Sequence, residues 1–217
     1  MKSEEFRDKL LECLGGDWPG SCPLESNIED CIQRDGYRLE KVSYQVELGE
    51  RVSAYVLIPD HVSAKSPAPG IAVWHQHNNN YVLGKSEPAG LLGDPQHFTG
   101  VALACEGYVV FCPDTLCFEE RQDPDLLNDD FERFNFLKYV VEGKCLAWKH
   151  IWDMKRGLDY LCSRADIKKD QIGCYGHSLG SQLTWLIGPW EKRLKCLVGN
   201  CCLPTYEAVH KNKLMHG

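Results

Sequence analysis

A serine flanked by two glycines is the segment of this 217-residue chain with the clearest chemical potential. Residues 172–181 read IGCYGHSLGS, so Ser178 lies between Gly176 and Gly180 in a G-x-S-x-G pattern. Apolar runs precede and follow the pattern, which predicts a strand that turns abruptly into a helix. Such a turn raises the serine hydroxyl above the sheet and directs the first helical amides at an oxyanion. The pattern therefore predicts a nucleophilic serine, with Leu179 N–H as the first oxyanion donor.

The two glycines have a steric explanation. Bulk two residues before or after a nucleophile on so tight a turn would collide with neighbouring atoms. A plainer interpretation makes Ser178 an ordinary helix N-cap, with glycines that only close a strand-to-helix turn. We favour the nucleophile because the strand, the turn and the helix agree. His177, next to the serine, is expected to point away from it and to serve in packing.

A polar loop after an earlier apolar run is the expected source of the second oxyanion donor. Residues 74–80 read WHQHNNN, and a doubly wound sheet places its ligand contacts at the carboxyl ends of its strands. We expect the His77 N–H to be the donor. We expect the side chains of His75, Gln76 and Asn78 to line the pocket. The alternative for this loop is a solvated, asparagine-rich turn.

Cofactor and metal interpretations fail on spacing. Residues 84–86 read GKS, but a phosphate-binding P-loop requires a glycine five residues before the Gly-Lys pair, and position 79 is Asn. The glycines around Ser178 also miss the spacing of dinucleotide-binding folds. The chain has no C-x-x-C pair, and the vicinal Cys201-Cys202 is a poor substitute. We therefore expect neither a cofactor nor a metal.

The elements that position these residues alternate between strand-like and helix-like patterns. Residues 37–46 and 52–58 read as an antiparallel hairpin. Short continuous apolar runs follow, as in strands buried on both faces, at residues 70–74, 108–112, 172–175 and 196–198. Residues 147–161 space their apolar side chains by three and four, as a helix does. The pattern predicts an α/β fold with a mostly parallel, doubly wound sheet and an N-terminal antiparallel hairpin.

Composition favours a single acidic domain. The chain has 24 Lys and Arg against 31 Asp and Glu, a net charge of -7, which argues against nucleic acid and membrane surfaces as partners. It shows neither a signal peptide nor a run of about 18 apolar residues, so we expect a cytoplasmic protein. Its 12 cysteines are expected to be free thiols. Residues 1–36 are predicted to be a helical or loop cover, and residues 37–217 the domain.

Together these motifs make the chain resemble the α/β-hydrolase superfamily, and within it the dienelactone-hydrolase and acetyl-xylan-esterase-like branch. The resemblance rests on residues 74–80 with 84–87, on residues 113–121, and on the segment around Ser178. It implies a serine hydrolase that cleaves small-molecule carboxylic esters, such as acetyl esters or lactones, through an acyl-enzyme on Ser178. The alternative is a non-catalytic α/β-hydrolase-like protein with a binding or assembly role.

The resemblance also implies partners for Ser178 that this sequence does not contain. In this fold the catalytic acid follows the seventh strand and the histidine the eighth, whereas the predicted strands here end at residues 195–199. We therefore interpret the chain as C-terminally truncated, lacking the last two strands. Glu207 with His210 or His216 has the chain order of a catalytic acid and histidine, but no strand separates them. We therefore interpret these residues as charged surface residues. The uncovered edge at residues 195–204 is expected to promote self-association.

Overall fold

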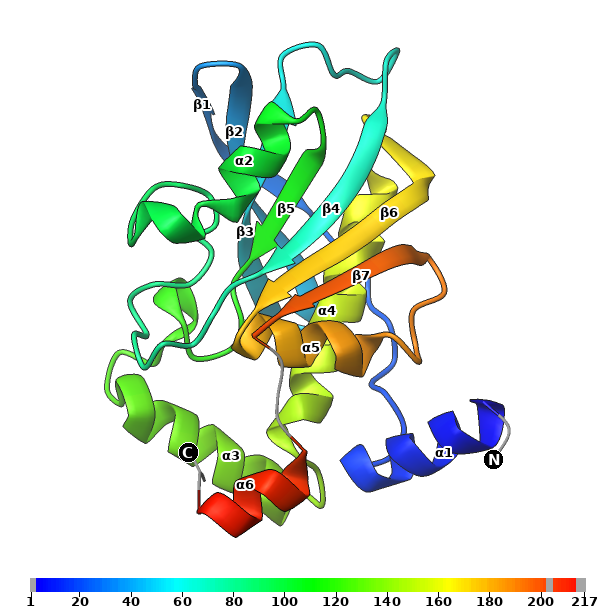
Figure 1. The fold of residues 1–217 in the computed structure, drawn as a ribbon, viewed down its shortest axis with the longest axis vertical. Helices are drawn as coiled ribbons and strands as arrows, with labels where there is room; N and C mark the ends of the chain where they lie inside the picture. The colour runs from blue at the N-terminus through cyan, green and yellow to red at the C-terminus, as the bar shows by residue number, and fades with distance from the viewer. Residues whose placement is uncertain (1–2, 202–204, 214–217) are drawn as a thin grey trace.

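A mixed sheet of seven strands forms the centre of the computed structural model, which describes residues 3–201 and 205–213 (Figure 1). The strands are β1 (Asn27–Gln33), β2 (Tyr37–Glu47), β3 (Glu50–Pro59), β4 (Ala68–Trp74), β5 (Val109–Pro113), β6 (Ile167–His177) and β7 (Leu194–Asn200). The helices are α1 (Ser3–Leu14), α2 (Thr99–Cys105), α3 (Asn128–Val141), α4 (Leu146–Ser163), α5 (Leu179–Ile187) and α6 (Tyr206–Asn212), with short 3-10 helices at Pro95–His97 and Glu119–Arg121.

The sheet has an antiparallel half and a parallel half. Its strand order is β1-β2-β3-β5-β4-β6-β7. The pairs β1–β2, β2–β3 and β3–β5 are antiparallel, whereas β5–β4, β4–β6 and β6–β7 are parallel. The carboxyl ends of β4, β5, β6 and β7 therefore meet at one edge of the sheet (Figure 1). This is the edge at which the sequence places Ser178 and the loop after Trp74.

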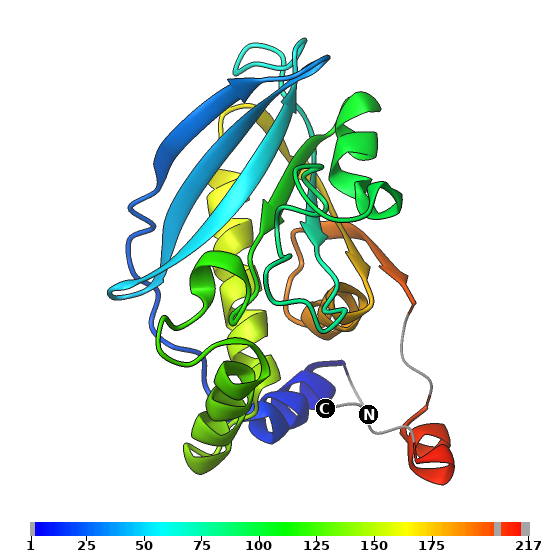
Figure 2. The same cartoon turned by 90° about the vertical axis from the view of Figure 1, so that its left-hand side faces the viewer.

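Helices cover the sheet from both sides. α4 and α5 pack on one face and α2 on the other (Figure 2). Ile151, Leu158 and Leu161 of α4 are fully buried against the sheet, as their helical spacing predicts. The predicted α/β fold, with an antiparallel hairpin before the parallel strands, is confirmed.

The N-terminal segment differs from expectation in one element. Residues 1–36 contain the predicted helix, α1, and also β1, an edge strand that pairs with β2. All seven residues of β1 are exposed, so neither face of this strand is buried against the core. Its sequence therefore need not alternate between apolar and polar residues, which is the pattern that would predict a strand. The described cysteines are free thiols. None of the described helices is long and apolar enough to cross a membrane.

Candidate active site

Ser178 has an unusual backbone conformation at the junction of β6 and α5. Its φ is 53° and its ψ is -112°, a region that side-chain-bearing residues rarely adopt. The Ser178 N–H donates a hydrogen bond of 3.0 Å to the carbonyl oxygen of Asn200. Its own carbonyl oxygen accepts from the N–H groups of Ser181 and Gln182, at 3.0 and 3.1 Å. The tight strand-to-helix turn predicted from the sequence is thus held by backbone bonds on both sides.

The glycines on either side of Ser178 leave no room for a side chain. A Cβ on Gly176 would lie 1.9 Å from the carbonyl oxygen of Gly180. A Cβ on Gly180 would lie 2.1 Å from the carbonyl oxygen of Trp74 and 2.9 Å from that of His75. The end of β4 therefore packs directly against the first turn of α5. This contact brings the loop that begins at His75 beside the serine.

The two amides predicted to bind an oxyanion have no hydrogen-bond acceptor among the described residues. Leu179 is the first residue of α5, where a helix leaves its N–H groups without an intrahelical acceptor. Neither the Leu179 N–H nor the His77 N–H donates a hydrogen bond to any described residue. No acceptor among the described residues therefore occupies either N–H.

The three predicted pocket side chains occupy different surroundings. His75 is 3% exposed, its Nδ1 donates to the Gln76 carbonyl oxygen (2.7 Å), and its Nε2 accepts from the Thr115 N–H (3.1 Å). Burial lowers the pKa of His75 to about 4, so the ring is neutral near pH 7. Gln76 donates to Glu87 at 2.8 Å, and both His75 and Gln76 line a small cavity beside His177. Asn78 is exposed.

His77 has both ring nitrogens engaged. Its Nδ1 accepts a hydrogen bond from the Asn79 N–H at 3.0 Å, so the proton of the neutral ring lies on Nε2. Nε2 lies 2.9 Å from a carboxylate oxygen of Glu132 on α3. With no nitrogen free, the ring is not placed to take a proton from Ser178. The sequence analysis did not single out Glu132.

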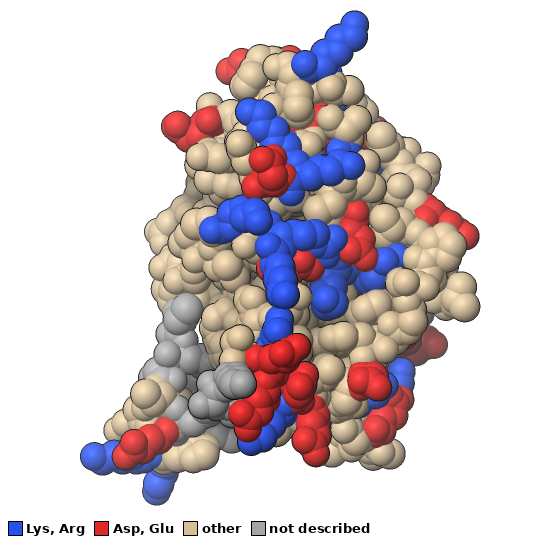
Figure 3. All heavy atoms as spheres, turned by 90° about the vertical axis from the view of Figure 1, so that its right-hand side faces the viewer, with Lys and Arg blue, Asp and Glu red and all other residues tan. Residues whose placement is uncertain are grey.

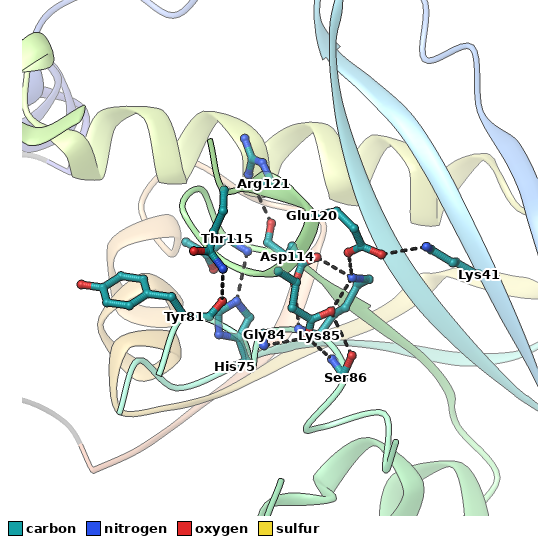
Figure 4. Close-up of polar contacts among 12 residues, drawn as sticks. Lys41, His75, Tyr81, Gly84, Lys85, Ser86, Asp114, Thr115, Glu120 and Arg121 are labelled. Atoms are coloured by element: carbon teal, nitrogen blue, oxygen red, sulfur yellow. Dashed lines mark hydrogen bonds and ion pairs between the residues drawn. The ribbon is translucent and has the colours of Figure 1, made fainter. Parts of the chain in front are cut away.

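A buried lysine joins two of the segments on which the family resemblance rests (Figure 4). The Lys85 side chain is 0% exposed, and its Nζ lies 2.6 Å from Asp114 Oδ2 and 2.5 Å from Glu119 Oε2, with Glu120 as a third partner. Glu119 Oε1 also accepts from the N–H groups of Gly84 and Ser86, at 2.7 and 2.8 Å. Residues 84–86 are thereby fastened to the segment after β5.

The three carboxylates around Lys85 have the spacing of a cation site. One oxygen each from Asp114, Glu119 and Glu120 lies within 4.8 Å of the others. The ammonium of Lys85 lies among them and supplies the positive charge. Burial alone would raise the pKa of Glu120, but hydrogen bonds from Lys41 and Lys85 outweigh it and lower this pKa to about 2. The cluster is therefore an internal ion network that braces the loop after β4.

The remaining histidines near the serine form a pair. The rings of His177 and His97 have centroids 4.9 Å apart, and Asn200 Nδ2 donates to His177 Nδ1 at 3.0 Å. Burial and the neighbouring His97 lower the pKa of His177. In the described parts of the chain, Ser178 Oγ makes no hydrogen bond with any histidine or with Glu207. His216 lies outside the described residues.

Comparisons with known proteins agree with this architecture. A model of the Abhydrolase family matches residues 21–211. A Bacillus subtilis (strain 168) protein, YtaP, whose hydrolase designation is itself provisional, is 28% identical over 216 residues, which are 98% of this chain and 68% of that protein.

Solved structures share the fold at low sequence identity. A Bacteroides fragilis NCTC 9343 protein described provisionally as an acetyl xylan esterase matches with a TM-score of 0.75 and 21% identity, over 88% of this chain and 50% of that one. Acetyl xylan esterase 1 from Thermoanaerobacterium sp. JW/SL YS485 matches with a TM-score of 0.64 and 14% identity, over 99% of this chain and 63% of that one. The chain thus spans between half and about two thirds of the length of these relatives.

Proposed function

The chain belongs to the Abhydrolase family, and on that basis we propose that it cleaves carboxylic esters of small molecules with Ser178 as the nucleophile. One observation carries the proposal. Ser178 is held at φ 53° between two glycines that admit no side chain. Strain of this kind persists only where the surrounding structure enforces it, and it is typical of sites that do chemistry. The acetyl xylan esterases among the structural neighbours support a small acyl group, such as acetyl.

The proposed reaction follows from the groups around the serine. Ser178 Oγ attacks the ester carbonyl carbon and loses its proton to a general base, and the carbonyl oxygen becomes an oxyanion. The N–H groups of Leu179 and His77 would donate to that oxyanion. The tetrahedral intermediate then expels the alcohol, which leaves with the proton, and an acyl-enzyme remains. Water releases the acid and restores Ser178.

The general base is not assigned to a described residue. His75 and His77 use both ring nitrogens in hydrogen bonds, and His177 uses Nδ1 with Asn200. A serine without a base has little nucleophilicity near neutral pH. This observation favours the second candidate function, a non-catalytic α/β-hydrolase-like protein with a binding or assembly role.

A fluorophosphonate probe separates the two functions. The proposal expects the probe to label Ser178 covalently. Labelling of the 217-residue chain should be weak, because no described residue is placed to take the proton from Ser178. Ser178→Ala should abolish labelling, whereas Ser66→Ala, at an exposed serine, should leave it unchanged. Labelling that survives Ser178→Ala would refute the nucleophile. A folded wild-type chain that neither labels nor hydrolyses p-nitrophenyl acetate would favour the non-catalytic role.

A further inference from the structure

We propose that Glu132 of α3 is a positioning residue that holds the loop at residues 75–80, and with it the His77 N–H, in place for oxyanion binding. The inference rests on the proposed function, in which this N–H is the second oxyanion donor. It adds a residue that lies outside the motifs around Ser178 and belongs to a different element.

One carboxylate oxygen binds the residues on both sides of the three asparagines of the loop. Glu132 Oε2 lies 2.9 Å from His77 Nε2 and 2.6 Å from the Tyr81 hydroxyl. His77 and Tyr81 are four residues apart and flank the three asparagines of the loop. A single acceptor on α3 therefore holds His77, which carries the proposed donor, and Tyr81, which follows the loop.

The protonation states suit this role. The Asn79 N–H occupies His77 Nδ1, so Nε2 carries the hydrogen that Glu132 accepts. Burial alone would raise the pKa of Glu132, but hydrogen bonds from His77 and Tyr81 outweigh it and lower this pKa. Burial and the hydrogen bond to Glu132 raise the pKa of Tyr81, so its hydroxyl remains a donor. Charge-assisted bonds to a carboxylate are stronger than neutral ones.

Aromatic packing connects His77 and Tyr81, the two residues bonded to Glu132, with the residue after Ser178. The His77 ring meets Tyr81 and Phe118 edge-on, each with centroids 5.1 Å away, and Tyr81 stacks on Phe118 at 5.2 Å. The cluster of Tyr81 and Phe118 also packs against Leu179, the residue that follows Ser178. A shift of the His77 ring would therefore change the positions of both proposed oxyanion donors, the N–H groups of His77 and Leu179.

The loop itself needs such support. Asn78 and Asn79 both have φ 48°, a left-handed conformation, and both are exposed. Asparagine tolerates this conformation better than most residues, but it remains a minor one. The bonds that hold it are the Asn79 N–H to His77 Nδ1 and the Asn80 N–H to the His77 carbonyl oxygen, each 3.0 Å long. Both depend on where His77 lies.

The test compares three variants on α3. Glu132→Ala removes the acceptor, Glu132→Gln keeps one oxygen that can accept from both donors, and Asp130→Ala removes an exposed acid of the same helix as a control. In Glu132→Ala, amide exchange at residues 77–80 should accelerate about tenfold. The rate of fluorophosphonate labelling at Ser178 should fall by about 10- to 100-fold, since loss of a whole oxyanion donor costs about 100- to 1,000-fold. Glu132→Gln should be impaired less than Glu132→Ala, because its neutral oxygen still accepts but makes weaker bonds, and Asp130→Ala should match the wild type in both measurements.

The two measurements separate this inference from the proposed function. If the wild type does not label, the proposed function fails, and amide exchange still decides whether Glu132 holds the loop. Unchanged exchange in Glu132→Ala would overturn the inference, and so would a Glu132→Gln variant as impaired as Glu132→Ala. Should Glu132→Ala fail to fold, Tyr81→Phe removes one of the two bonds and keeps the ring. It should then give a smaller acceleration of exchange, and no acceleration would overturn the inference.

Discussion

The carbonyl oxygen of Trp74 lies where a side chain of Gly180 would begin, since a Cβ added there would be 2.1 Å away. This contact joins the end of β4 to the first turn of α5, and the loop after β4 and the start of α5 each carry one of the proposed oxyanion donors. Neither partner can move easily, because Trp74 pairs with Gly176 in the sheet and Gly180 is buried within α5. The relative position of the two donors is thus set by backbone packing.

Gly180→Ala should destabilise the protein strongly. The new methyl group meets backbone rather than a flexible side chain, so the strand or the helix must shift, and overpacking of this kind costs about 1–3 kcal/mol or more. Urea denaturation would measure the loss. Gly20→Ala is the matched control, because a Cβ there meets nothing within 4 Å, and it should change the free energy of unfolding little. A Gly180→Ala variant as stable as the wild type would contradict the packing.

Ser178→Gly should raise the free energy of unfolding and abolish labelling. Glycine adopts positive φ without the steric penalty that a serine side chain meets, and relief of such strain outweighs the entropy gained by the unfolded chain. We expect the free energy of unfolding to rise by about 1 kcal/mol and fluorophosphonate labelling to disappear. Ser181→Gly, inside α5, should instead lower stability by about 1 kcal/mol. A Ser178→Gly variant less stable than the wild type would show that the serine is not strained.

Buried histidines should make stability fall with mild acid. Burial and the nearby Arg121 lower the pKa of His150 to about 3, while the His75 pKa is about 4. Below about pH 6.5 the unfolded chain gains protons at these positions that the folded protein does not take up, so unfolding is favoured as pH falls. Each histidine should contribute about 1.4 kcal/mol of lost stability per pH unit until its folded pKa is reached.

His150→Leu isolates one of these contributions. Its Nε2 is buried without a hydrogen-bond partner among the described residues, so leucine loses no bond there. Urea unfolding at pH 7 and pH 5 should show a smaller drop in His150→Leu than in the wild type, by about 2 kcal/mol. His61→Gln, at an exposed histidine, is the control and should keep the full drop. An identical drop in all three proteins would mean that folding does not lower the pKa of His150.

The part of the site that the sequence predicts is the part that is local. Gly176, Ser178 and Gly180 lie within five residues, and their spacing alone specifies a turn whose sterics the structure bears out. The continuous apolar runs likewise predicted the parallel strands. Those at residues 70–74 and 108–112 are largely buried, as expected, whereas the run at residues 196–198 lies in the exposed part of β7.

The missed parts depend on contacts between distant segments. Lys85 meets Asp114 and Glu119, about thirty residues away, and the sequence showed only a G-K-S segment that fails as a P-loop. Glu132 meets His77 from a helix whose apolar residues point in several directions, including exposed Phe134 and Leu137, so no pattern marks its inner face. Such pairings become visible only when the chain is folded.

The free edge of β7 leads to the last prediction, which concerns self-association. In the described sheet β7 pairs only with β6, and Leu197 and Val198 are 40% and 47% exposed. An unpaired apolar edge can recruit another strand, so we propose that copies of this chain associate through residues 195–204, of which 202–204 lie outside the described residues. Opposing this, Lys168, Lys169 and Lys195 are exposed on β6 and β7, and basic side chains gather on this side of the molecule (Figure 3).

Because like charges repel across the proposed contact, association should strengthen as salt screens them. The Debye length falls from about 10 Å at 0.1 M salt to about 3 Å at 1 M. Light scattering at both salt concentrations should show a larger mass at the higher one. Val198→Lys should abolish the increase, since lysine on an edge strand disfavours pairing. Val141→Lys, at an equally apolar but more exposed position on α3, should not. A monomer at every concentration of protein and salt, or an effect of Val141→Lys equal to that of Val198→Lys, would show that β7 is not the contact.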